Sequence, residues 1–193
     1  MSAGIPDLAR PAPLVAPRLL GCRLRVGAVC ARISEVEAYH GEEDRACHAS
    51  RGRTPRAAGL YREPGALYVY LCYGIHHLLN LVTDRIGVPS AVLIRGVSLL
   101  AGESLARERR GIAAGALARL TNGPGKVTQA LGLGAADHGG VLGEPGCRLE
   151  LLPPLHEPVG PPVIGSRVGV DYAGSEWAVK PWRWWEPGFP AAK

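Results

Sequence analysis

Alternation of apolar and polar residues in two stretches of the chain restricts its fold more than any other feature of the sequence. Residues 22–39 read CRLRV, GA and VCARISEVEAY, and residues 68–71 and 76–83 alternate on either side of CYGI. A period of two is that of a strand with one buried face, and two such runs joined by a short turn are typical of a β-hairpin. A largely apolar run at 90–97 predicts a further buried strand. The sequence therefore predicts a mostly antiparallel sheet.

Helix-compatible spacing of apolar residues occurs outside these strands, in three stretches at residues 13–20, 99–120 and 126–133. The first stretch stops at Gly21, a residue type that commonly ends helices. Shorter alternating runs predict strands at 148–152 and 166–170. No repeat, low-complexity tract or domain boundary interrupts the chain. We therefore expect a single α+β domain over residues 13–193, after a loose tail at residues 1–12.

The composition excludes a membrane-spanning or disordered chain. Apolar residues make up 47% of the sequence and charged residues 20%, and no uninterrupted apolar run approaches the roughly 20 residues that cross a bilayer. The five cysteines are odd in number and contain no C-x-x-C pair, which makes a poor framework for disulfides or zinc. The N-terminal sequence has an acid and several prolines where a signal peptide needs a basic start and an apolar centre. We expect a cytoplasmic protein with reduced thiols.

The charge balance favours a polyanionic partner. The chain carries +5 at pH 7, and the excess lies in the first hundred residues, which hold 12 basic and 8 acidic side chains. Arginine accounts for 19 of the 22 Lys and Arg residues. Arginine binds phosphate by two parallel hydrogen bonds, but a GC-rich genome produces the same bias, so both explanations of the arginine content stay open.

The strand predicted at 29–39 carries two carboxylates. A period of two gives one of its faces to four side chains, Ile33, Glu35, Glu37 and Tyr39. A carboxylate beside an aromatic ring can serve as a general base that activates water next to a sugar carbon. A solvated strand face is the other explanation, and this stretch alone does not decide between them.

Three tyrosines belong to the hairpin predicted around CYGI. Tyr68 and Tyr70 share one strand face, whereas Tyr73 falls in the turn, where core packing does not explain an aromatic side chain. Proteins that kink or unstack duplex DNA insert such exposed wedges between bases. Folding of Tyr73 back onto its own sheet, and core packing of Tyr68 and Tyr70, are the alternatives.

Residues 40–66 are polar and rich in Gly, Arg and Pro, and they predict a long surface loop of the kind that is usually functional. This loop carries side chains suited to phosphate or base contacts: His48, Arg51, Arg53, Thr54 and Arg56. A solvated basic loop is the alternative. Further along, Gly123-Pro-Gly-Lys126 does not complete a nucleotide-binding loop. It predicts a helix N-terminus that either meets one backbone phosphate or is simply capped.

Nothing in the sequence predicts a metal or another cofactor. His76 and His77 are adjacent, so on a strand they point to opposite faces, and no acid or cysteine lies at ligand spacing beside them. We therefore expect no metal site and no cofactor.

Taken together, the motifs resemble, in order, those of the alkyladenine (3-methylpurine) DNA glycosylase family, from about residue 13 to residue 183. The matching segments are Glu35-Val-Glu37-Ala-Tyr39, Glu43-Asp44, His48, Arg53-Thr-Pro-Arg56, Pro64-Gly65, Tyr68-Val-Tyr70, Tyr73-Gly74, Asn80, Val92-Leu-Ile-Arg95, Gly123-Pro-Gly-Lys126, Arg167-Val-Gly169 and Trp177-Ala-Val-Lys180-Pro. No single segment would suffice, but a co-linear set of this length is specific.

The resemblance implies a single domain with a curved, mostly antiparallel sheet flanked by helices and a protruding β-hairpin that inserts into DNA. It also implies a monomeric, cofactor-free and monofunctional enzyme of base excision repair. Such an enzyme flips an alkylated or deaminated purine out of double-stranded DNA and hydrolyses its N-glycosidic bond. The implied substrates are of the 3-methyladenine, 7-methylguanine and hypoxanthine type.

Residue by residue, the resemblance makes Glu37 the general base and gives Arg95 a part in placing the water and the target phosphate. It implies a base pocket lined by Tyr39, His48 and Tyr70. There, Asn80 would clash with the exocyclic amino group of guanine, and Tyr73 would fill the gap left in the duplex. The implied DNA contacts come from Arg53, Thr54, Arg56 and Lys126.

Physical chemistry supports this assignment. Alkylation at N3 or N7 leaves a purine cationic, so aromatic walls attract it by about 0.5–2 kcal/mol more than a neutral base, and the charged base leaves without protonation. Two alternatives stay open on the sequence. One is a non-catalytic nucleic-acid-binding module whose tyrosines stack bases, and the other is a sugar hydrolase that uses Glu35 and Glu37 as its carboxylate pair.

Overall fold

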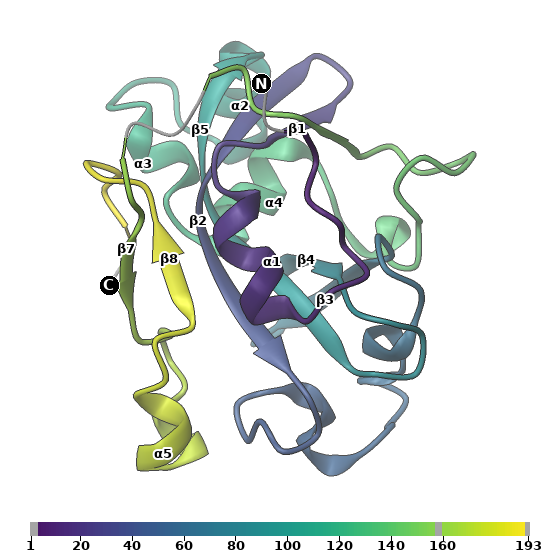
Figure 1. Ribbon diagram of the computed structural model, residues 1–193. Helices are drawn as coiled ribbons and strands as arrows, with labels where there is room; N and C mark the ends of the chain where they lie inside the picture. The colour runs from purple at the N-terminus through teal and green to yellow at the C-terminus, as the bar shows by residue number, and fades with distance from the viewer. Residues whose placement is uncertain (1–3, 157–159, 192–193) are drawn as a thin grey trace.

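Antiparallel strand pairing organises the chain, as the alternation predicts (Figure 1). The computed structural model describes residues 4–156 and 160–191. Its strands are β1 (Arg23–Val26), β2 (Val29–His40), β3 (Leu67–Cys72), β4 (His76–Val82), β5 (Ser90–Ala101), β6 (Glu150–Leu152), β7 (Val163–Gly165) and β8 (Arg183–Trp185). Its α-helices are α1 (Ala12–Leu19), α2 (Glu103–Arg110), α3 (Ala118–Thr121), α4 (Pro124–Leu131) and α5 (Ser175–Ala178). Four 3₁₀ turns complete the described elements: η1 (His48–Arg51), η2 (Ala58–Tyr61), η3 (Ala135–Asp137) and η4 (Asp171–Ala173).

The sheet is an eight-stranded, antiparallel one centred on the long strands β2 and β5. Its main order is β3-β4-β5-β2-β1-β6, and the C-terminal pair β7–β8 attaches through β8. Two strands pair with the same edge of β2: β1 pairs with its first residues, and β8 pairs with residues 35–37. In Figure 1, β7 and β8 accordingly run beside β2, away from β3 and β4. The predicted α+β class with a mostly antiparallel sheet is confirmed.

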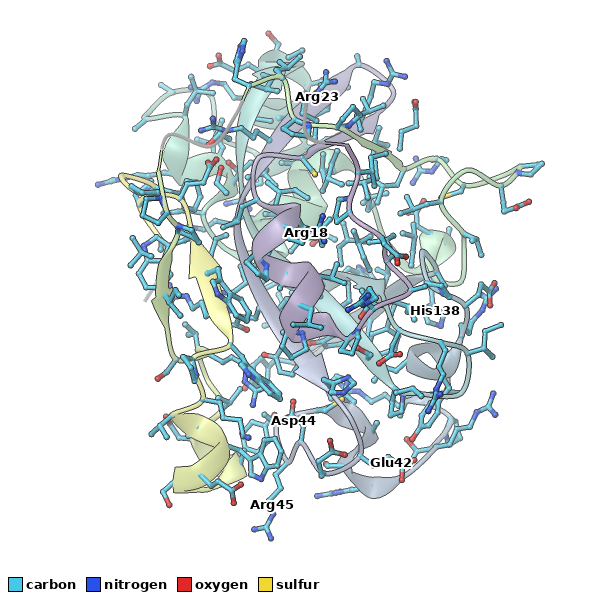
Figure 2. The ribbon with its side chains drawn as sticks, viewed as in Figure 1. Arg18, Arg23, Glu42, Asp44, Arg45 and His138 are labelled. Atoms are coloured by element: carbon cyan, nitrogen blue, oxygen red, sulfur yellow. The ribbon has the colours of Figure 1, made fainter. Side chains whose placement is uncertain are left out.

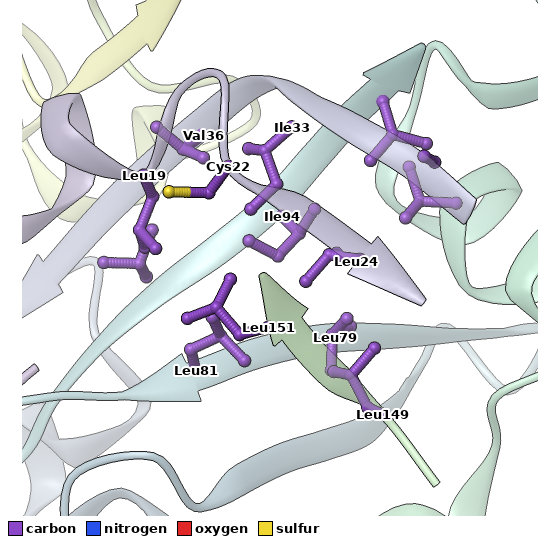
Figure 3. Close-up of a cluster of buried hydrophobic side chains, with 14 of the residues drawn as sticks. Leu19, Cys22, Leu24, Ile33, Val36, Leu79, Leu81, Ile94, Leu149 and Leu151 are labelled. Atoms are coloured by element: carbon purple, nitrogen blue, oxygen red, sulfur yellow. The ribbon is translucent and has the colours of Figure 1, made fainter. Parts of the chain in front are cut away.

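The hydrophobic core lies between one face of this sheet and two helices. Figure 3 shows core side chains from β1, β2, β4 and β5 together with Leu19 of α1. Helix α4 contributes Val127 and Leu131 to the same cluster. Along β5, Val92 and Ile94 face this core, and along β4, Leu79 and Leu81 do, as a period of two requires. The opposite face of the same strands is therefore left for other side chains.

The alternation predicted for residues 33–39 is wrong at one position. Ile33 belongs to the core together with Val36 and Ala38, so it does not share a face with Glu35 and Glu37. The pairing of β2 with β5 shifts between Ile33 and Glu35, and again between Glu35 and Val36. These shifts are β-bulges, and each extra residue reverses which side chains face the core. The second one leaves Arg95 of β5 without a direct partner on β2.

Two more predicted elements differ from the structure. The helix expected over 99–120 is divided, because β5 continues to Ala101 and Gly102 turns the chain into α2. Gly102 has a φ of +79°, and a Cβ there would lie 2.6 Å from the carbonyl oxygen of Ala28, so no other residue fits. The strand expected at 166–170 does not form, and β7 ends just before it at Gly165. The Val168 N–H and the Arg167 side chain of this segment bond instead to residues of the site described below.

The N-terminal segment meets the rest of the molecule before α1 begins. The backbone N–H of Asp84 donates to the carbonyls of Leu8 and Arg10, and Leu8 packs against the core. Ala12, the last residue assigned to the tail, is the first residue of α1. Residues 1–3, the start of that tail, and residues 192–193 lie outside the described residues. No described helix combines the length and apolar character that crossing a membrane would need.

Candidate active site

One face of four neighbouring strands carries the candidate site. In the order β2, β5, β4 and β3, a row of directly paired residues crosses the sheet: Glu37, Leu93, Asn80 and Tyr68. Two residues further along the chain lie Tyr39 on β2, Arg95 on β5 and Tyr70 on β3. Because side chains two apart on a strand share a face, the alternation that fills the core also gathers these polar and aromatic groups on the other side.

A cavity of about 580 Å³ lies over this face. Its lining includes side chains from the sheet, the 40–66 loop, the β3–β4 hairpin and the C-terminal segment: Tyr39, His48, Arg56, Tyr70, Tyr73, Asn80, Arg95, Val168 and Tyr172. A concave site of several hundred Å³ with aromatic walls and a few polar groups suits a flat, ring-containing ligand. The structure thus brings all of the predicted base-pocket residues together around one cavity.

Glu37 lies directly behind the cavity lining and is fully buried. Its Oε2 accepts a hydrogen bond from Tyr39 Oη at 2.8 Å, and its Oε1 accepts one from the backbone N–H of Val168 at 2.7 Å. Burial raises the pKa of Glu37 above its usual value, and the positive charge of Arg95 opposes that rise only in part. A carboxylate that is fixed at both oxygens and has a raised pKa is well suited to accept a proton from water.

Arg95 connects Glu37 to the second carboxylate of β2. Its Nε lies 3.0 Å from Glu35 Oε1, with which it forms a hydrogen bond, and 3.4 Å from Glu37 Oε1. Arg183 of β8 donates to the same Glu35 oxygen at 2.7 Å. Gly96 permits this arrangement, because a Cβ there would meet Glu35 Cβ at 3.1 Å and the Phe189 ring at 2.5 Å. Two guanidinium groups therefore balance two buried carboxylates.

His48 and Tyr68 fix one wall of the cavity. Tyr68 Oη lies 3.0 Å from the Arg56 carbonyl oxygen, which can only accept, so the hydroxyl donates there. His48 Nδ1, 2.8 Å from the same hydroxyl, must then be the donor, which leaves Nε2 as an acceptor. Burial and the charge of Arg56 lower the pKa of His48 to about 4, so the ring is neutral at pH 7. The His48 ring also packs edge-on against Tyr70, with 4.6 Å between centroids.

Tyr73 occupies the tip of the β3–β4 hairpin and is 91% exposed. Its φ is +50°, and Gly74 next to it has a φ of +70°. Two positive φ values, with the Ile75 N–H bonded to the Cys72 carbonyl, make a type I′ turn, which usually contains Asn and Gly. A large aromatic residue with a positive φ strains the backbone, and the turn would form without it.

Asn80 is buried, and its orientation is fixed. Its Nδ2 donates to the carbonyl of Tyr68 at 3.0 Å, across the β3–β4 pair. The side chain lines the cavity and is only 4% exposed. An amide that cannot turn away from the cavity restricts the outline of any ring that enters it.

The four predicted DNA-contact residues are not equivalent. Arg56 lines the cavity, with its Cζ 5.3 Å from the Tyr70 ring centroid. Arg53 is exposed and lies over the Tyr61 ring at 5.4 Å, and Thr54 Oγ1 accepts from the Ala57 N–H at 3.2 Å. Lys126 Nζ, on α4, donates to Asn122 Oδ1 at 2.8 Å. Arg53, Thr54 and Lys126 do not belong to the cavity lining.

Sequence reasoning missed the part that the C-terminal segment plays. Arg167 is buried and binds both oxygens of Asp44, at 2.6 and 2.9 Å. Its guanidinium also stacks on the Tyr39 ring, 4.8 Å from the centroid, and on the Trp182 ring, at 5.1 Å. In Figure 2, Asp44 lies in the segment after β2, at the end of the molecule where α5 is found. The segments Glu43-Asp44 and Arg167-Val-Gly169 of the resemblance contain the two residues, but nothing in the sequence predicts that they meet.

Metal ligation has no support in residues 4–156 and 160–191, where no group of three or more His, Cys, Asp or Glu side chains could hold an ion. A buried carboxylate behind an aromatic-walled cavity on an antiparallel sheet fits a hydrolase whose substrate carries a flat ring. Comparison with known proteins agrees with this class and narrows it.

A family model of methylpurine-DNA glycosylases matches residues 7–190. The chain is 42% identical over 192 residues to a Cutibacterium acnes protein that carries the name of a 3-methyladenine DNA glycosylase, and 95% of each chain is covered. It is 43% identical over 185 residues to a Myxococcus xanthus protein of the same name, covering 92% of this chain and 86% of the relative. It is 48% identical over 169 residues to the Arabidopsis thaliana DNA-3-methyladenine glycosylase, covering 88% of this chain and 65% of the relative.

The chain belongs to the methylpurine-DNA glycosylase family. It is a hydrolytic DNA glycosylase of the 3-methyladenine type, as the resemblance implied. The non-catalytic binding module that the sequence left open is therefore wrong. The family match likewise gives no support to the other alternative, a sugar hydrolase that uses Glu35 and Glu37 as its carboxylate pair.

Proposed function

We propose that the cavity receives one damaged purine nucleotide, flipped out of double-stranded DNA, and that Glu37 activates the water that releases its base. One observation carries the proposal: Glu37 is fully buried, held at both oxygens, and bonded to residues that line the aromatic cavity. An enzyme that acts on a base within a duplex must first extrude it, which costs a few kcal/mol and costs least for a weakly paired, damaged base.

In the proposed reaction, Glu37 takes a proton from water while the water oxygen attacks C1′ of the sugar. The C1′–N bond breaks and its electron pair goes to the base. A 3- or 7-alkylated purine, which is cationic, leaves as a neutral molecule and needs no acid. A neutral base such as hypoxanthine must gain a proton on leaving. In this proposal Glu37 acts as the general base without a cofactor.

Base selection follows from the walls of the cavity. Tyr39 and Tyr70 would stack on the flipped ring, and His48 Nε2 offers it an acceptor. Asn80 would clash with the exocyclic amino group of guanine, because its hydrogen bond to Tyr68 holds it in place. We therefore propose 3-methyladenine and hypoxanthine as substrates. For 7-methylguanine, the strain against Asn80 opposes the benefit of its charge.

Contacts with the DNA outside the flipped nucleotide complete the proposal. Tyr73, 91% exposed, would enter the stack at the site of the missing base. Arg53, Thr54, Arg56 and Lys126 would meet phosphates around the cavity, with Arg95 near the target phosphate. A single copy of the chain holds every one of these residues, so the proposed enzyme works as a monomer. Its substrate would place it on the nucleoid, in the cytoplasm.

The test is single-turnover release of the base from a labelled duplex that contains one 3-methyladenine or one hypoxanthine. Glu37→Gln should lower the release rate by about 100- to 10,000-fold, the usual contribution of a general base, while the variant still binds the damaged duplex. Glu150→Gln is the matched control, since Glu150 is half exposed and pairs with Arg25 outside the site.

The possible outcomes separate the function from the role of Glu37. Equal release by wild type and Glu37→Gln would remove Glu37 from the reaction. Release from single-stranded DNA but not from the duplex would refute the flipping step. Failure of the wild type to release either base would reject the proposed substrates.

A further inference from the structure

The proposed reaction leaves Glu35 without a role, although it is as buried as Glu37. Glu35 is 0% exposed and lies two residues before Glu37 on β2. Its Oε1 accepts two hydrogen bonds, from Nε of Arg95 at 3.0 Å and from Nε of Arg183 at 2.7 Å. Its Oε2 is buried and accepts no hydrogen bond from the described residues. Burial of a charge is costly unless partners compensate for it, so its presence needs an explanation.

Arg95 lies between the two carboxylates. The same Nε atom is 3.0 Å from Glu35 Oε1 and 3.4 Å from Glu37 Oε1, and only the contact with Glu35 is a hydrogen bond. Arg95 lines the cavity. All of its contacts with the two carboxylates of the described chain are made by Nε, which leaves the terminal nitrogens, Nη1 and Nη2, available to a ligand in the cavity.

We propose that Glu35 is a positioning residue that holds Arg95 by Nε, and thereby prevents Arg95 from forming a full ion pair with Glu37. The inference rests on the proposed function of Glu37 as the base. It assigns Glu35 two effects. The terminal nitrogens of Arg95 stay directed at the substrate, and the Glu37 carboxylate stays free to take a proton.

The physical reason is competition between two anions for one cation. An arginine and a carboxylate prefer to pair through two parallel hydrogen bonds. With the charge of Glu35 removed, Glu37 is the remaining carboxylate beside Arg95, and the guanidinium would turn toward it. A full ion pair favours the ionised form of Glu37 and so makes it a weaker base. The same movement would withdraw Nη1 and Nη2 from the cavity.

The charged and titratable groups that face Glu37 come from four segments. Tyr39 faces it from β2, Arg95 from β5, Arg183 from β8, and Arg167 from the segment before η4, whose Val168 N–H also donates to Glu37. Burial raises the pKa of Glu37, whereas Arg95, Arg183, Tyr39 and the Val168 N–H lower it. Loss of the charge at Glu35 strengthens the contribution of Arg95. The acid limb of the pH–rate profile should then move to lower pH.

The experiment is the pH dependence of single-turnover base release by Glu35→Gln, compared with wild type and Glu150→Gln. Glutamine keeps the size and an acceptor oxygen but lacks the charge. We expect the plateau rate to fall by about 10- to 100-fold, the cost of misplacing a catalytic group by about 1 Å. We expect the acid limb to move down by about one pH unit, as one nearby opposite charge can do. Glu35→Asp should recover part of the rate.

A double variant keeps the test informative if Glu35→Gln folds poorly. Glu35→Gln combined with Arg95→Met removes both charges together and leaves neither one buried alone. If Glu35 acts through Arg95, this double variant should release base at the rate of Arg95→Met alone. Independent action predicts that the two losses multiply.

The results distinguish this inference from the proposed function. An unchanged pH profile and plateau rate in Glu35→Gln, with wild-type release intact, would overturn the role of Glu35 only. A lower melting temperature with the wild-type pH profile would overturn it too, since it would make Glu35 a structural anchor of β8. Absence of base release in the wild type would overturn the proposed function itself.

Discussion

The two faces of strand β2 both carry fully buried side chains, yet the two faces are chemically opposite. On β2, Val36 is 0% exposed on the core face, and Glu35 and Glu37 are 0% exposed on the site face. Burial therefore does not distinguish core from site in this molecule. What differs is the partner: apolar side chains contact one another on the first face, whereas on the second each charge has a hydrogen bond or an opposite charge.

This difference separates stability from chemistry within single strands. Burying a Val, Leu or Ile side chain contributes about 1.5–3 kcal/mol, so the core face stabilises the sheet. The site face costs free energy, because desolvated carboxylates are only partly compensated by their partners. Substitutions on the two faces should therefore have opposite signatures, and the predictions below test that contrast.

The largest loss of stability should come from breaking the buried ion pair beside the site. Arg167→Met leaves Asp44 charged, buried and unpaired, and we expect the free energy of unfolding to fall by about 3–5 kcal/mol. Base release should fall as well, since Arg167 supports Tyr39 and precedes Val168. Urea unfolding measures the first effect. The double variant Asp44→Asn/Arg167→Met should recover much of the lost stability, and failure to do so would argue against the ion pair as the cause.

A core-face substitution should lower stability without changing the chemistry. Leu79→Ala removes a fully buried side chain and should cost about 2–5 kcal/mol in urea unfolding. Its neighbour Asn80 faces the site, so the single-turnover rate of the folded enzyme should stay within about twofold of wild type. A rate loss as large as that of Glu37→Gln would show that the two faces are not independent.

On the site face, Glu37→Gln should stabilise the protein in a pH-dependent way. The pKa of Glu37 is raised in the folded state, so its contribution to stability is present below the unfolded-state pKa and is lost as pH rises through the folded-state pKa. Glutamine does not titrate. The gain in unfolding free energy over wild type should therefore be larger at about pH 8 than at about pH 4. A gain that is greatest in acid would contradict the raised pKa.

The smallest effect on stability is expected at the hairpin tip. Tyr73→Gly relieves a positive φ, so we expect the unfolding free energy to stay unchanged or to rise by up to about 1 kcal/mol. Binding of a damaged duplex should weaken by about 1–3 kcal/mol, as loss of one stacking ring does. Ile75→Ala, an exposed neighbour in the same hairpin, is the control and should retain affinity. Equal losses in both variants would refute a specific role for the Tyr73 ring.

Local patterns in the sequence predicted most of the strands but not their irregularities. The pairing of β1 with β2 and of β3 with β4, and the end of α1 before Gly21, follow from alternation and turn residues close in the chain. The paired bulges near Glu35 do not, because they depend on how β2 and β5 meet, and those strands lie some 60 residues apart. These bulges direct Arg95 toward the site.

The candidate site shows the same division. Alternation alone put Glu35, Glu37 and Tyr39 on one face, and the resemblance added the remaining cavity residues. No pattern could predict that the Val168 N–H, 131 residues away, holds Glu37. The segment 166–170 was expected to be a strand because its residue pattern allows one, but its groups bond to Glu37 and Asp44 instead.

By itself, the sequence determined the fold class, the strands that carry the chemistry, and the family whose motifs it shares. Tertiary structure decided which buried side chains belong to the core and which to the site. It also placed Arg95 between two carboxylates and buried Glu37, which raises the pKa of Glu37. The physical reason is the distance along the chain over which each effect acts. Periodicity and turn preference act between neighbours in the chain, whereas desolvation and ion pairing depend on groups that only folding brings within a few Å.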